Sequence, residues 1–240
     1  MRKRADLLLV ERGYFASRAR AQAAIEAGLV SADGRLVLRA SDMLVDNAEI
    51  EASAPHPWVS RGGVKLAAAL DAFGLDPKGL VCLDVGASTG GFTDALLARG
   101  AAMVIAVDVG RGQLDPRLAA DPRVVSHEGL DARALTAEIV GAPDAIVCDV
   151  SFISQRLVLP VVLALAARPA WLVSLVKPQF EVGRDKLVKG AVKDPADLKA
   201  ACVAVRDCVE GLGWTSVGLV PSPIDGGDGA REFLYAARHE

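Results

Sequence analysis

The sequence predicts an α/β protein in which a small α+β module precedes a larger domain built on a doubly wound parallel sheet. From residue 61 onward, short apolar runs alternate with helical stretches, which is the pattern of strand–helix–strand units. Several of these runs end in an aspartate or a lysine, and a stretch with two prolines separates them from the first 52 residues. We therefore predict a module over residues 1–52, a linker over 53–60 and the larger domain over 61–240.

The composition is that of a folded protein and excludes several classes. Of 240 residues, 52% are hydrophobic and 24% are charged, which excludes disordered, collagen-like and low-complexity proteins. The net charge of −3 rules out a uniformly basic surface, so any binding of nucleic acid must come from a local patch. The most apolar stretch, residues 157–167, contains Pro160 and is shorter than a membrane span. We expect no membrane span.

The cysteines and histidines predict no metal site. The four cysteines form no Cys-x-x-Cys pair, and the three histidines are scattered along the chain. Cys82 and Cys148 lie within apolar runs, which predicts buried, reduced thiols. Glu11 and Arg12 interrupt the first apolar run too early for a signal peptide. We therefore expect a cytoplasmic protein.

The amino-terminal module is predicted to contain two helices followed by three short strands. Ser17 is the expected N-cap of the second helix, and Gly28 is expected to end it. Asp33 and Gly34, between two apolar runs, predict a tight hairpin turn. In order, the predicted elements are helices over 2–11 and 18–27 and strands over 29–31, 36–38 and 49–51.

Basic residues gather on the two predicted helices of this module. Residues 1–20 contain six basic and two acidic residues. This charge fits either two solvated helix faces or a surface that follows phosphates. The basic helix pair, Ala-Gly-Leu-Val at 27–30 and Asp-Gly-Arg at 33–35 resemble the S-four RNA-binding domain, although Arg39-Ala40 stands where a Lys-Pro pair is usual. The resemblance implies RNA contacts by Arg2, Arg4, Arg18 and Arg20.

The larger domain is predicted to begin with a helix and then to alternate buried strands with helices. The predicted strands cover 80–85, 103–107, 123–125, 145–148 and 171–176, with two more over 214–220 and 232–237. The predicted helices cover 64–73, 92–99, 132–140, 153–167 and 195–212. In such a sheet, ligands bind at the carboxyl ends of the strands.

Polar residues end four of the predicted strands and are therefore expected on one rim of the sheet. They are Asp84, Asp108, Asp149 and Lys177. The turn over 86–91 has Gly-x-x-x-Gly-Gly spacing, which is not the Gly-x-Gly-x-x-Gly spacing of dinucleotide enzymes. Asp108 ends the second strand, where an acid either accepts hydrogen bonds from ribose hydroxyls or caps a helix. Turn and acid together predict an adenosine-bearing ligand.

The segment Leu-Asp-Val-Gly-Ala-Ser-Thr-Gly-Gly-Phe-Thr-Asp at 83–94, with Val-Asp at 107–108, resembles the cofactor site of class I S-adenosylmethionine methyltransferases. The resemblance implies a Rossmann-like methyltransferase sheet and S-adenosylmethionine as cofactor. It also implies that Asp131 meets the adenine amino group. The implied cofactor-binding residues are Asp84, Gly86, Ala87, Ser88, Thr89, Gly90, Gly91, Phe92, Asp108 and Asp131.

The end of the fourth strand favours a hydroxyl as the methyl acceptor. Asp149-Val150-Ser151-Phe152 lacks the prolines of enzymes that methylate base amino groups. A ribose hydroxyl needs a base, and a lysine can act as one only when it is neutral. Considered one at a time, the candidate residues also fit ordinary roles, namely a surface lysine, a helix cap and a strand-edge acid.

Taken together, Lys65, Asp149, Lys177 and Glu232 are similar to the tetrad of FtsJ-type ribose 2′-O-methyltransferases. With the amino-terminal module, the whole chain resembles the TlyA family of ribosomal RNA cytidine-2′-O-methyltransferases, also described as haemolysins. The resemblance implies ribosomal RNA and ribosomal subunits as partners. It also implies that Lys177 is the base, Asp149 positions the hydroxyl, and Lys65 and Glu232 complete the site. The chemistry alone leaves open which lysine takes the proton.

Residues 178–193 are predicted to form a long basic loop beside Lys177. Either an RNA clamp or a disordered surface loop fits this composition, and the clamp would use Arg184, Lys189 and Lys193. Three other functions remain as alternatives. For membrane lysis, the sequence has no amphipathic cationic helix, and for a nicotinamide-dependent dehydrogenase the glycine spacing is wrong. An RNA-binding factor that retains the fold without methyltransferase activity stays open.

Overall fold

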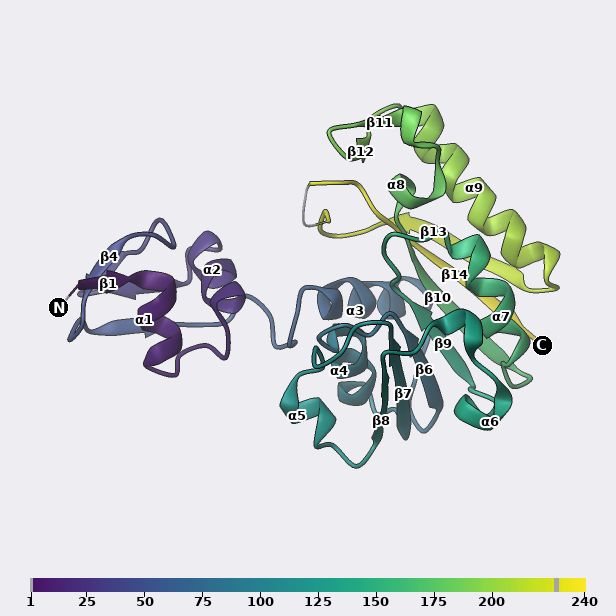
Figure 1. The fold of residues 1–240 in the computed structure, drawn as a ribbon, viewed down its shortest axis with the longest axis horizontal. Helices are drawn as coiled ribbons and strands as arrows, with labels where there is room; N and C mark the ends of the chain where they lie inside the picture. Colours follow the sequence, from purple (N-terminus) through teal and green to yellow (C-terminus); the bar gives the residue numbers. More distant parts are fainter. Residues whose placement is uncertain (1, 227–228) are drawn as a thin grey trace. The chain divides into compact units, whose positions relative to one another are not determined.

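The computed structural model describes residues 2–226 and 229–240 and divides the chain into two compact units, residues 1–57 and 58–240 (Figure 1). The division falls within the segment predicted as a linker. Each unit is described by itself.

The smaller unit consists of two helices and two small antiparallel sheets. One sheet pairs β1 with β4, and the other has the order β3-β2-β5. Leu8, Leu9, Phe15 and Ile25 are among the buried side chains of its core. The elements are β1 (Arg2–Arg4), α1 (Ala5–Glu11), α2 (Arg18–Glu26), β2 (Val30–Ala32), β3 (Arg35–Leu36), β4 (Met43–Val45) and β5 (Ile50–Ala52).

Local signals predict most of this unit, and a long-range pairing overrides them at its start. The side chain of Ser17 accepts a hydrogen bond from the amide of Arg20, and Asp33 and Gly34 both have positive φ, as a type I′ hairpin turn requires. The helix predicted from residue 2 begins only at Ala5. Arg2–Arg4 instead forms a strand paired with Met43–Val45, a partner distant in sequence that no local propensity reveals.

The larger unit is built on a seven-stranded sheet with the order β13-β14-β10-β9-β6-β7-β8. The five strands from β10 to β8 are parallel, whereas β14 and β13 are antiparallel to their neighbours. The strands are β6 (Val81–Val85), β7 (Met103–Asp108), β8 (Val124–Glu128), β9 (Ala145–Cys148), β10 (Ala170–Val176), β13 (Thr215–Pro221) and β14 (Phe233–His239). The α/β class predicted from the sequence is confirmed.

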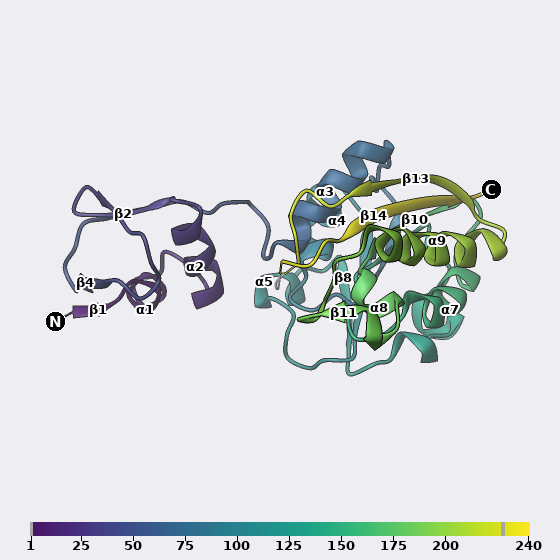
Figure 2. The same ribbon diagram turned by 90° about the horizontal axis from the view of Figure 1, so that it is seen from above.

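Helices cover both faces of this sheet, as Figures 1 and 2 show. Helices α3, α4 and α5 pack with one apolar cluster, and η1, α6, α7 and α9 pack with the other. In β10, Leu172 and Val176 join one cluster, and Val173 and Leu175 join the other, because successive side chains point to opposite faces. The helices are α3 (Gly62–Phe73), α4 (Gly91–Ala98), α5 (Pro116–Ala119), α6 (Ala137–Val140), α7 (Leu159–Ala164), α8 (Pro178–Glu181) and α9 (Pro195–Gly211), with 3₁₀ turns η1 (Ala132–Ala134), η2 (Gln155–Leu157) and η3 (Arg184–Lys186).

Three predicted segments of the larger unit differ in kind from the structure. The helix expected over 132–140 is divided into η1 and α6, because Leu135 and Thr136 are extended between them. The helix expected over 153–167 starts as η2 and continues only as the short α7. The loop expected over 178–193 contains α8, η3 and a hairpin of β11 (Leu187–Val188) and β12 (Ala191–Val192).

Cys82 and Cys148 are fully buried, as predicted, and burial raises the pKa of each thiol to about 12. Across residues 2–226 and 229–240, no helix is both long enough and apolar enough to cross a membrane. The same residues contain no cluster of histidine, cysteine and acidic side chains that would hold a metal ion.

Candidate active site

The predicted strand-end residues lie on one edge of the sheet. Asp84 is the last residue but one of β6, Asp108 ends β7, and Asp149 and Lys177 directly follow β9 and β10; these four strands are parallel and adjacent. Strand β14 runs the other way and brings Glu232 to the same edge. Its first residue, Phe233, pairs with Val176, so Glu232 and Lys177 are neighbours in the register.

The structure brings the four residues of the predicted tetrad together as two ion pairs. The Nζ atom of Lys65 lies 2.5 Å from Oε2 of Glu232, and both side chains are buried. The Nζ atom of Lys177 lies 2.6 Å from Oδ1 of Asp149 and donates a hydrogen bond of 2.8 Å to the hydroxyl of Ser151.

The two ion pairs act on each other electrostatically. Burial raises the pKa of Asp149 above its ordinary value, and the charge of Lys177 opposes that rise. The charge of Lys65 also opposes the rise in the pKa of Asp149, whereas the charge of Glu232 adds to it. The four groups therefore form one charged cluster, although they come from four separate segments of the chain.

Close backbone contacts at glycines hold these segments in place. A Cβ atom on Gly86, which has a φ of +84°, would lie 2.7 Å from the carbonyl oxygen of Asp149. A Cβ atom on Gly91 would lie 2.2 Å from Oγ of Ser60 and 3.0 Å from the amide nitrogen of Gly63. The glycine turn after β6 can therefore contact both the end of β9 and the first turn of α3, the helix that carries Lys65.

Asp84 has the properties expected of a group that binds a cationic ligand. Its side chain is fully buried, and Oδ2 accepts a hydrogen bond of 2.6 Å from the hydroxyl of Thr93. Oδ1 has no hydrogen-bond partner among the residues that the structure describes. Burial raises the pKa of Asp84 to about 7, and the charges of Asp149 and Asp108 add to the rise. A buried carboxylate with one oxygen that has no hydrogen-bond partner fits the ammonium group of an amino-acid ligand.

Asp108 organises the loops on either side of it. Its carboxylate accepts hydrogen bonds from the backbone amides of Ser88 and Gly110, at 2.8 and 2.7 Å. Ser88 has a φ of +48°, which is uncommon for a residue other than glycine. Glu128 was not predicted; its carboxylate accepts hydrogen bonds from three backbone N–H groups of the loop after β7. These bonds lower the pKa of Glu128.

The remaining predicted cofactor residues lie around the same turn in different environments. Ser88 and Thr89 are exposed, and the residues that are buried or partly buried are Gly86, Ala87, Gly90 and Gly91. Phe92 is 3% exposed, with its ring in the apolar cluster of α3 and α4, so only its backbone can meet a ligand. Asp131 caps η1 and pairs with Arg133, which lowers the pKa of Asp131 to about 2.

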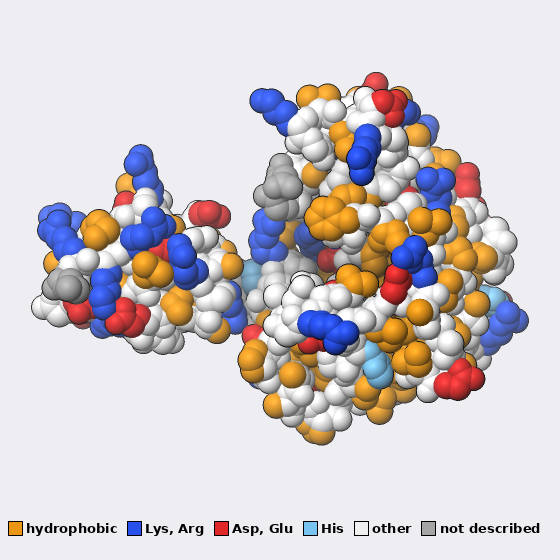
Figure 3. All heavy atoms as spheres, in the orientation of Figure 1, with side chains coloured by type: hydrophobic (Ala, Val, Ile, Leu, Met, Phe, Trp, Pro, Cys, Tyr) orange, Lys and Arg blue, Asp and Glu red, His pale blue; other side chains and the backbone are white. Residues whose placement is uncertain are grey.

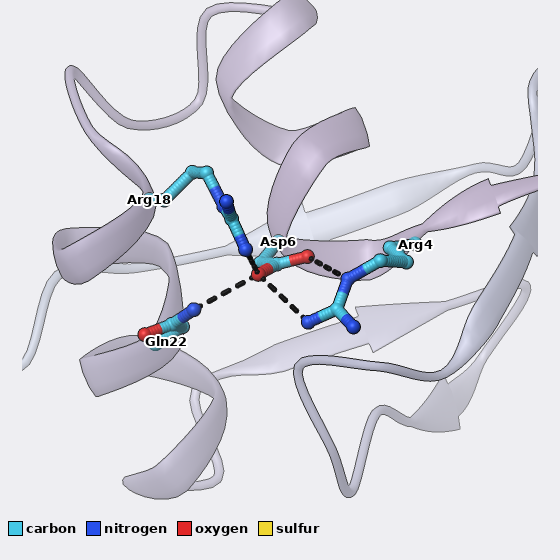
Figure 4. A network of polar contacts seen from close by, with 4 residues as sticks. All are labelled: Arg4, Asp6, Arg18 and Gln22. Atoms are coloured by element: carbon cyan, nitrogen blue, oxygen red, sulfur yellow. Dashed lines mark hydrogen bonds and ion pairs between the residues drawn. The ribbon is translucent and has the colours of Figure 1, made fainter.

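In the smaller unit, a buried carboxylate holds two of the predicted RNA-binding arginines (Figure 4). The side chain of Asp6 is fully buried and accepts hydrogen bonds from Arg4, Arg18 and Gln22. The hydrogen bond from Arg4 is the main reason why the pKa of Asp6 lies well below its usual range. The side chains of Arg4 and Arg18 remain 42% and 54% exposed.

The other predicted RNA-binding residues lie at the surface. Arg2 is exposed, and Arg20 is partly buried. Lysine and arginine side chains gather on the face of the smaller unit seen in Figure 3. Arg184, Lys189 and Lys193 are all exposed on or beside the β11–β12 hairpin, where Lys189 and Gly190 form the turn with positive φ.

An exposed aromatic side chain beside the tetrad was not predicted. Phe152 is 91% exposed and has a φ of +65°, a left-handed conformation that costs about 1–2 kcal/mol for a residue other than glycine. Its ring centroid lies 5.2 Å from that of Phe180. Sequence patterns assign phenylalanine to the core, so neither its exposure nor its conformation had a signal.

Three comparisons with known proteins bear on this site. Residues 58–239 match the family described as FtsJ-like methyltransferase. The chain is 46% identical to the 16S/23S rRNA (cytidine-2′-O)-methyltransferase TlyA of Mycobacterium tuberculosis, over 99% of this chain and 90% of that protein.

Solved structures show the same similarity. One from Streptococcus thermophilus, named as a hemolysin, is 37% identical, with a TM-score of 0.77 over 99% of this chain and 88% of that one. The magnesium protoporphyrin IX methyltransferase ChlM from Synechocystis PCC 6803, solved with bound SAH, has a TM-score of 0.53 at 17% identity, over 74% of this chain and 81% of that one. This similarity shows the shared fold, and the predicted Rossmann-like methyltransferase sheet is confirmed.

Proposed function

The chain belongs to the FtsJ-like methyltransferase family and is a relative of TlyA, and on this premise we propose that it transfers a methyl group from S-adenosylmethionine to a ribose 2′-hydroxyl of a cytidine in ribosomal RNA. The observation that carries the proposal is the cluster of Lys65, Asp149, Lys177 and Glu232 next to the turn that follows β6. Ribosomal subunits are then its partners, and the cytoplasm is its place of action.

The residues around the turn have the chemistry to hold S-adenosylmethionine. When bound, the cofactor supplies a methyl group on a positively charged sulfur. The open oxygen of Asp84 suits its ammonium group, and the carboxylate of Asp108 suits the ribose hydroxyls. Asp131, near the end of β8, is the candidate for the adenine amino group.

In the proposed reaction, the tetrad prepares the hydroxyl for attack. Lys177 must first release its own proton to solvent, and its amine then takes the 2′-hydroxyl proton as the oxygen accepts the methyl group that the bound cofactor would supply. Asp149 accepts a hydrogen bond from the Lys177 amine, which holds that amine, and through it the hydroxyl, in line with that methyl group. Lys65 and Glu232, held 2.5 Å apart, keep their charges fixed beside the reacting groups.

RNA recognition is assigned to three surfaces. The smaller unit, which we infer to be an S-four-type domain, presents Arg2, Arg4, Arg18 and Arg20 to phosphates. The β11–β12 hairpin presents Arg184, Lys189 and Lys193. Exposed beside the tetrad, Phe152 offers an aromatic face on which a base can stack.

A methyl-transfer assay on ribosomal subunits from a strain without the gene tests the proposal. The parent chain is expected to transfer labelled methyl groups to ribosomal RNA. Lys177→Ala is expected to lower kcat at least a thousandfold, and Lys65→Ala less, because Lys177 takes the proton. Binding of S-adenosylhomocysteine to both variants is the control for folding. An equal loss in the two variants would leave the base unassigned, and full activity of Lys177→Ala would contradict the mechanism.

A further inference from the structure

Glu181 is a buried carboxylate close to the tetrad that the proposed reaction does not use. It ends α8, four residues after Lys177, and its side chain is 1% exposed. Both of its oxygens contact the segment that follows β9. Oε2 accepts a hydrogen bond of 2.6 Å from the hydroxyl of Ser154, and Oε1 accepts one of 2.7 Å from the amide of Gln155.

Gln155 extends this contact to β10, the strand that leads to Lys177. Its side chain is 2% exposed. The side-chain amide donates a hydrogen bond of 2.6 Å to the carbonyl oxygen of Leu175, and its side-chain oxygen accepts one from the hydroxyl of Ser174. Arg156 supplies a counter-charge, with Nε 3.5 Å from Oε2 of Glu181. We call Glu181, Ser154 and Gln155 the Glu181 clamp.

The contacts of the Glu181 clamp join two segments of the chain, residues 149–154 and residues 177–181, which also contact each other at Lys177. Residues 149–154 leave the sheet at Asp149, whose amide bonds to the carbonyl of Val85, and end where the clamp holds Ser154. Within this segment, Asp149 and Ser151 both contact Lys177. The second segment runs from Lys177 through α8 to Glu181. The position of each of these side chains relative to Lys177 therefore depends on the clamp.

The same segment contains the unusual backbone of Phe152. A left-handed conformation at a phenylalanine persists only when its surroundings hold it. The clamp fixes the chain two residues later, and the Phe180 ring, from α8, packs against Phe152. The buried charge of Glu181 is satisfied by these hydrogen bonds only in this arrangement, which opposes movement of the segment.

We propose that Glu181 is a positioning residue for methyl transfer, which holds Asp149, Ser151 and Phe152 in place against Lys177. The proposal rests on the proposed function, because the reaction is the one that these residues serve. Glu181 itself touches neither substrate nor cofactor. Its loss is therefore expected to slow the chemical step and leave binding of the cofactor intact.

The first test is the kinetics of Glu181→Gln in the full chain. We expect kcat for ribosomal RNA to fall at least tenfold and the Kd for S-adenosylhomocysteine to be unchanged, with a smaller rise in KM for RNA because the displaced Phe152 stacks less well on a base. Ser154→Ala removes one of the hydrogen bonds and is expected to lower kcat about threefold. The double variant is expected to be no slower than Glu181→Gln, since both changes affect one contact.

Two variants control for effects on folding. Glu210→Gln alters a carboxylate that also accepts a serine hydroxyl, that of Ser216 at 2.7 Å, between α9 and β13. Val205→Ala removes buried volume in α9. Both are expected to keep the parent kcat, even where Val205→Ala lowers Tm as much as Glu181→Gln does.

Fluorine NMR tests the same proposal without activity. The chain has six phenylalanines, and labelling with 4-fluorophenylalanine, with Phe152→Leu for assignment, reports on the Phe152 ring. We expect its resonance to move in Glu181→Gln and Ser154→Ala and to stay in Glu210→Gln. Parent kcat together with a parent Phe152 resonance in both clamp variants would overturn the proposal. If the parent chain transfers no methyl group, the proposed function fails, and the fluorine spectra still decide whether the clamp holds the segment.

Discussion

At the scale of single residues, the role proposed for Asp84 predicts that cofactor binding depends on pH. Its raised pKa of about 7 means that the folded chain binds a proton there at pH 6, where the unfolded chain, with a pKa of about 3.9, does not. Asp84 therefore lowers the stability of the free protein as pH rises from about 4 to 7. An ammonium group that binds the charged carboxylate displaces this proton.

We therefore predict that affinity for S-adenosylhomocysteine rises about tenfold between pH 6 and pH 8, because the charged fraction of Asp84 rises by about that factor. Calorimetry in buffers of different ionisation enthalpy should show release of a proton near pH 7. Asp84→Asn should bind weakly and without release of a proton. A parent affinity that does not change with pH would show that the ammonium group is bound elsewhere.

Asp6 has the opposite effect on stability, because its pKa is lowered in the folded chain and not raised. Arg4 and the other donors keep its pKa low, so the stability that it contributes is complete above its unfolded pKa of about 3.9 and is lost as pH falls toward the folded value. We expect Asp6→Asn to destabilise residues 1–57 by about 2 kcal/mol at pH 7, seen as faster hydrogen exchange there, and to weaken RNA binding because Arg4 and Arg18 lose their fixed positions. Asp42→Asn, in the same unit, controls for the loss of a charge. Unchanged exchange in Asp6→Asn would contradict this role.

The position of a single residue could be predicted where a general rule places the side chain. Asp84, Asp108, Asp149 and Lys177 lie at the carboxyl ends of apolar strands, and parallel strands bring such residues to one edge. Glu232 could be predicted as a site residue only from the family resemblance, because the residues of β14 do not indicate that this strand runs antiparallel to β10. The positions of Phe152 and Glu181 depend on contacts between distant segments, which no local pattern reveals.

At the scale of elements, prediction was best for long segments with a clear period and worst where short structure depends on a neighbour. Helix α9 and strand β9 match their predicted ranges to within a residue. The basic segment after Lys177 was predicted as a loop, because two-residue strands leave almost no pattern. Its hairpin is anchored instead by a contact of 2.5 Å between Nζ of Lys186 and Oδ1 of Asp197 in α9.

A built hairpin that carries exposed lysines is better suited to hold RNA than a disordered loop, since its ordering cost is already met. We predict that reversing both Lys189 and Lys193 to glutamate weakens RNA binding at least tenfold at low salt and makes it less sensitive to salt. Affinity for S-adenosylhomocysteine should stay the same. Lys78→Glu, at an exposed lysine before β6, serves as a matched change of charge for each of the two single variants, Lys189→Glu and Lys193→Glu. Unchanged RNA affinity at low salt would remove the hairpin from the RNA surface.

At the scale of the whole molecule, the sheet gathers groups that are far apart in sequence. The turn after β6, the ends of β9 and β10, the start of β14 and the first turn of α3 meet at one edge, and glycines permit the approach. The residues predicted to bind the cofactor and those of the predicted tetrad therefore lie at the same edge of the sheet. We propose that the site at this edge methylates the oxygen of a ribose and leaves the bases unmodified.

The most direct test is mass spectrometry of the nucleosides released from ribosomal RNA after incubation with the purified chain and S-adenosylmethionine. The predicted result is 2′-O-methylcytidine with the parent chain and none with Lys177→Ala. Methyl groups found on the bases, or equal amounts of 2′-O-methylcytidine with the parent and the variant, would contradict the account.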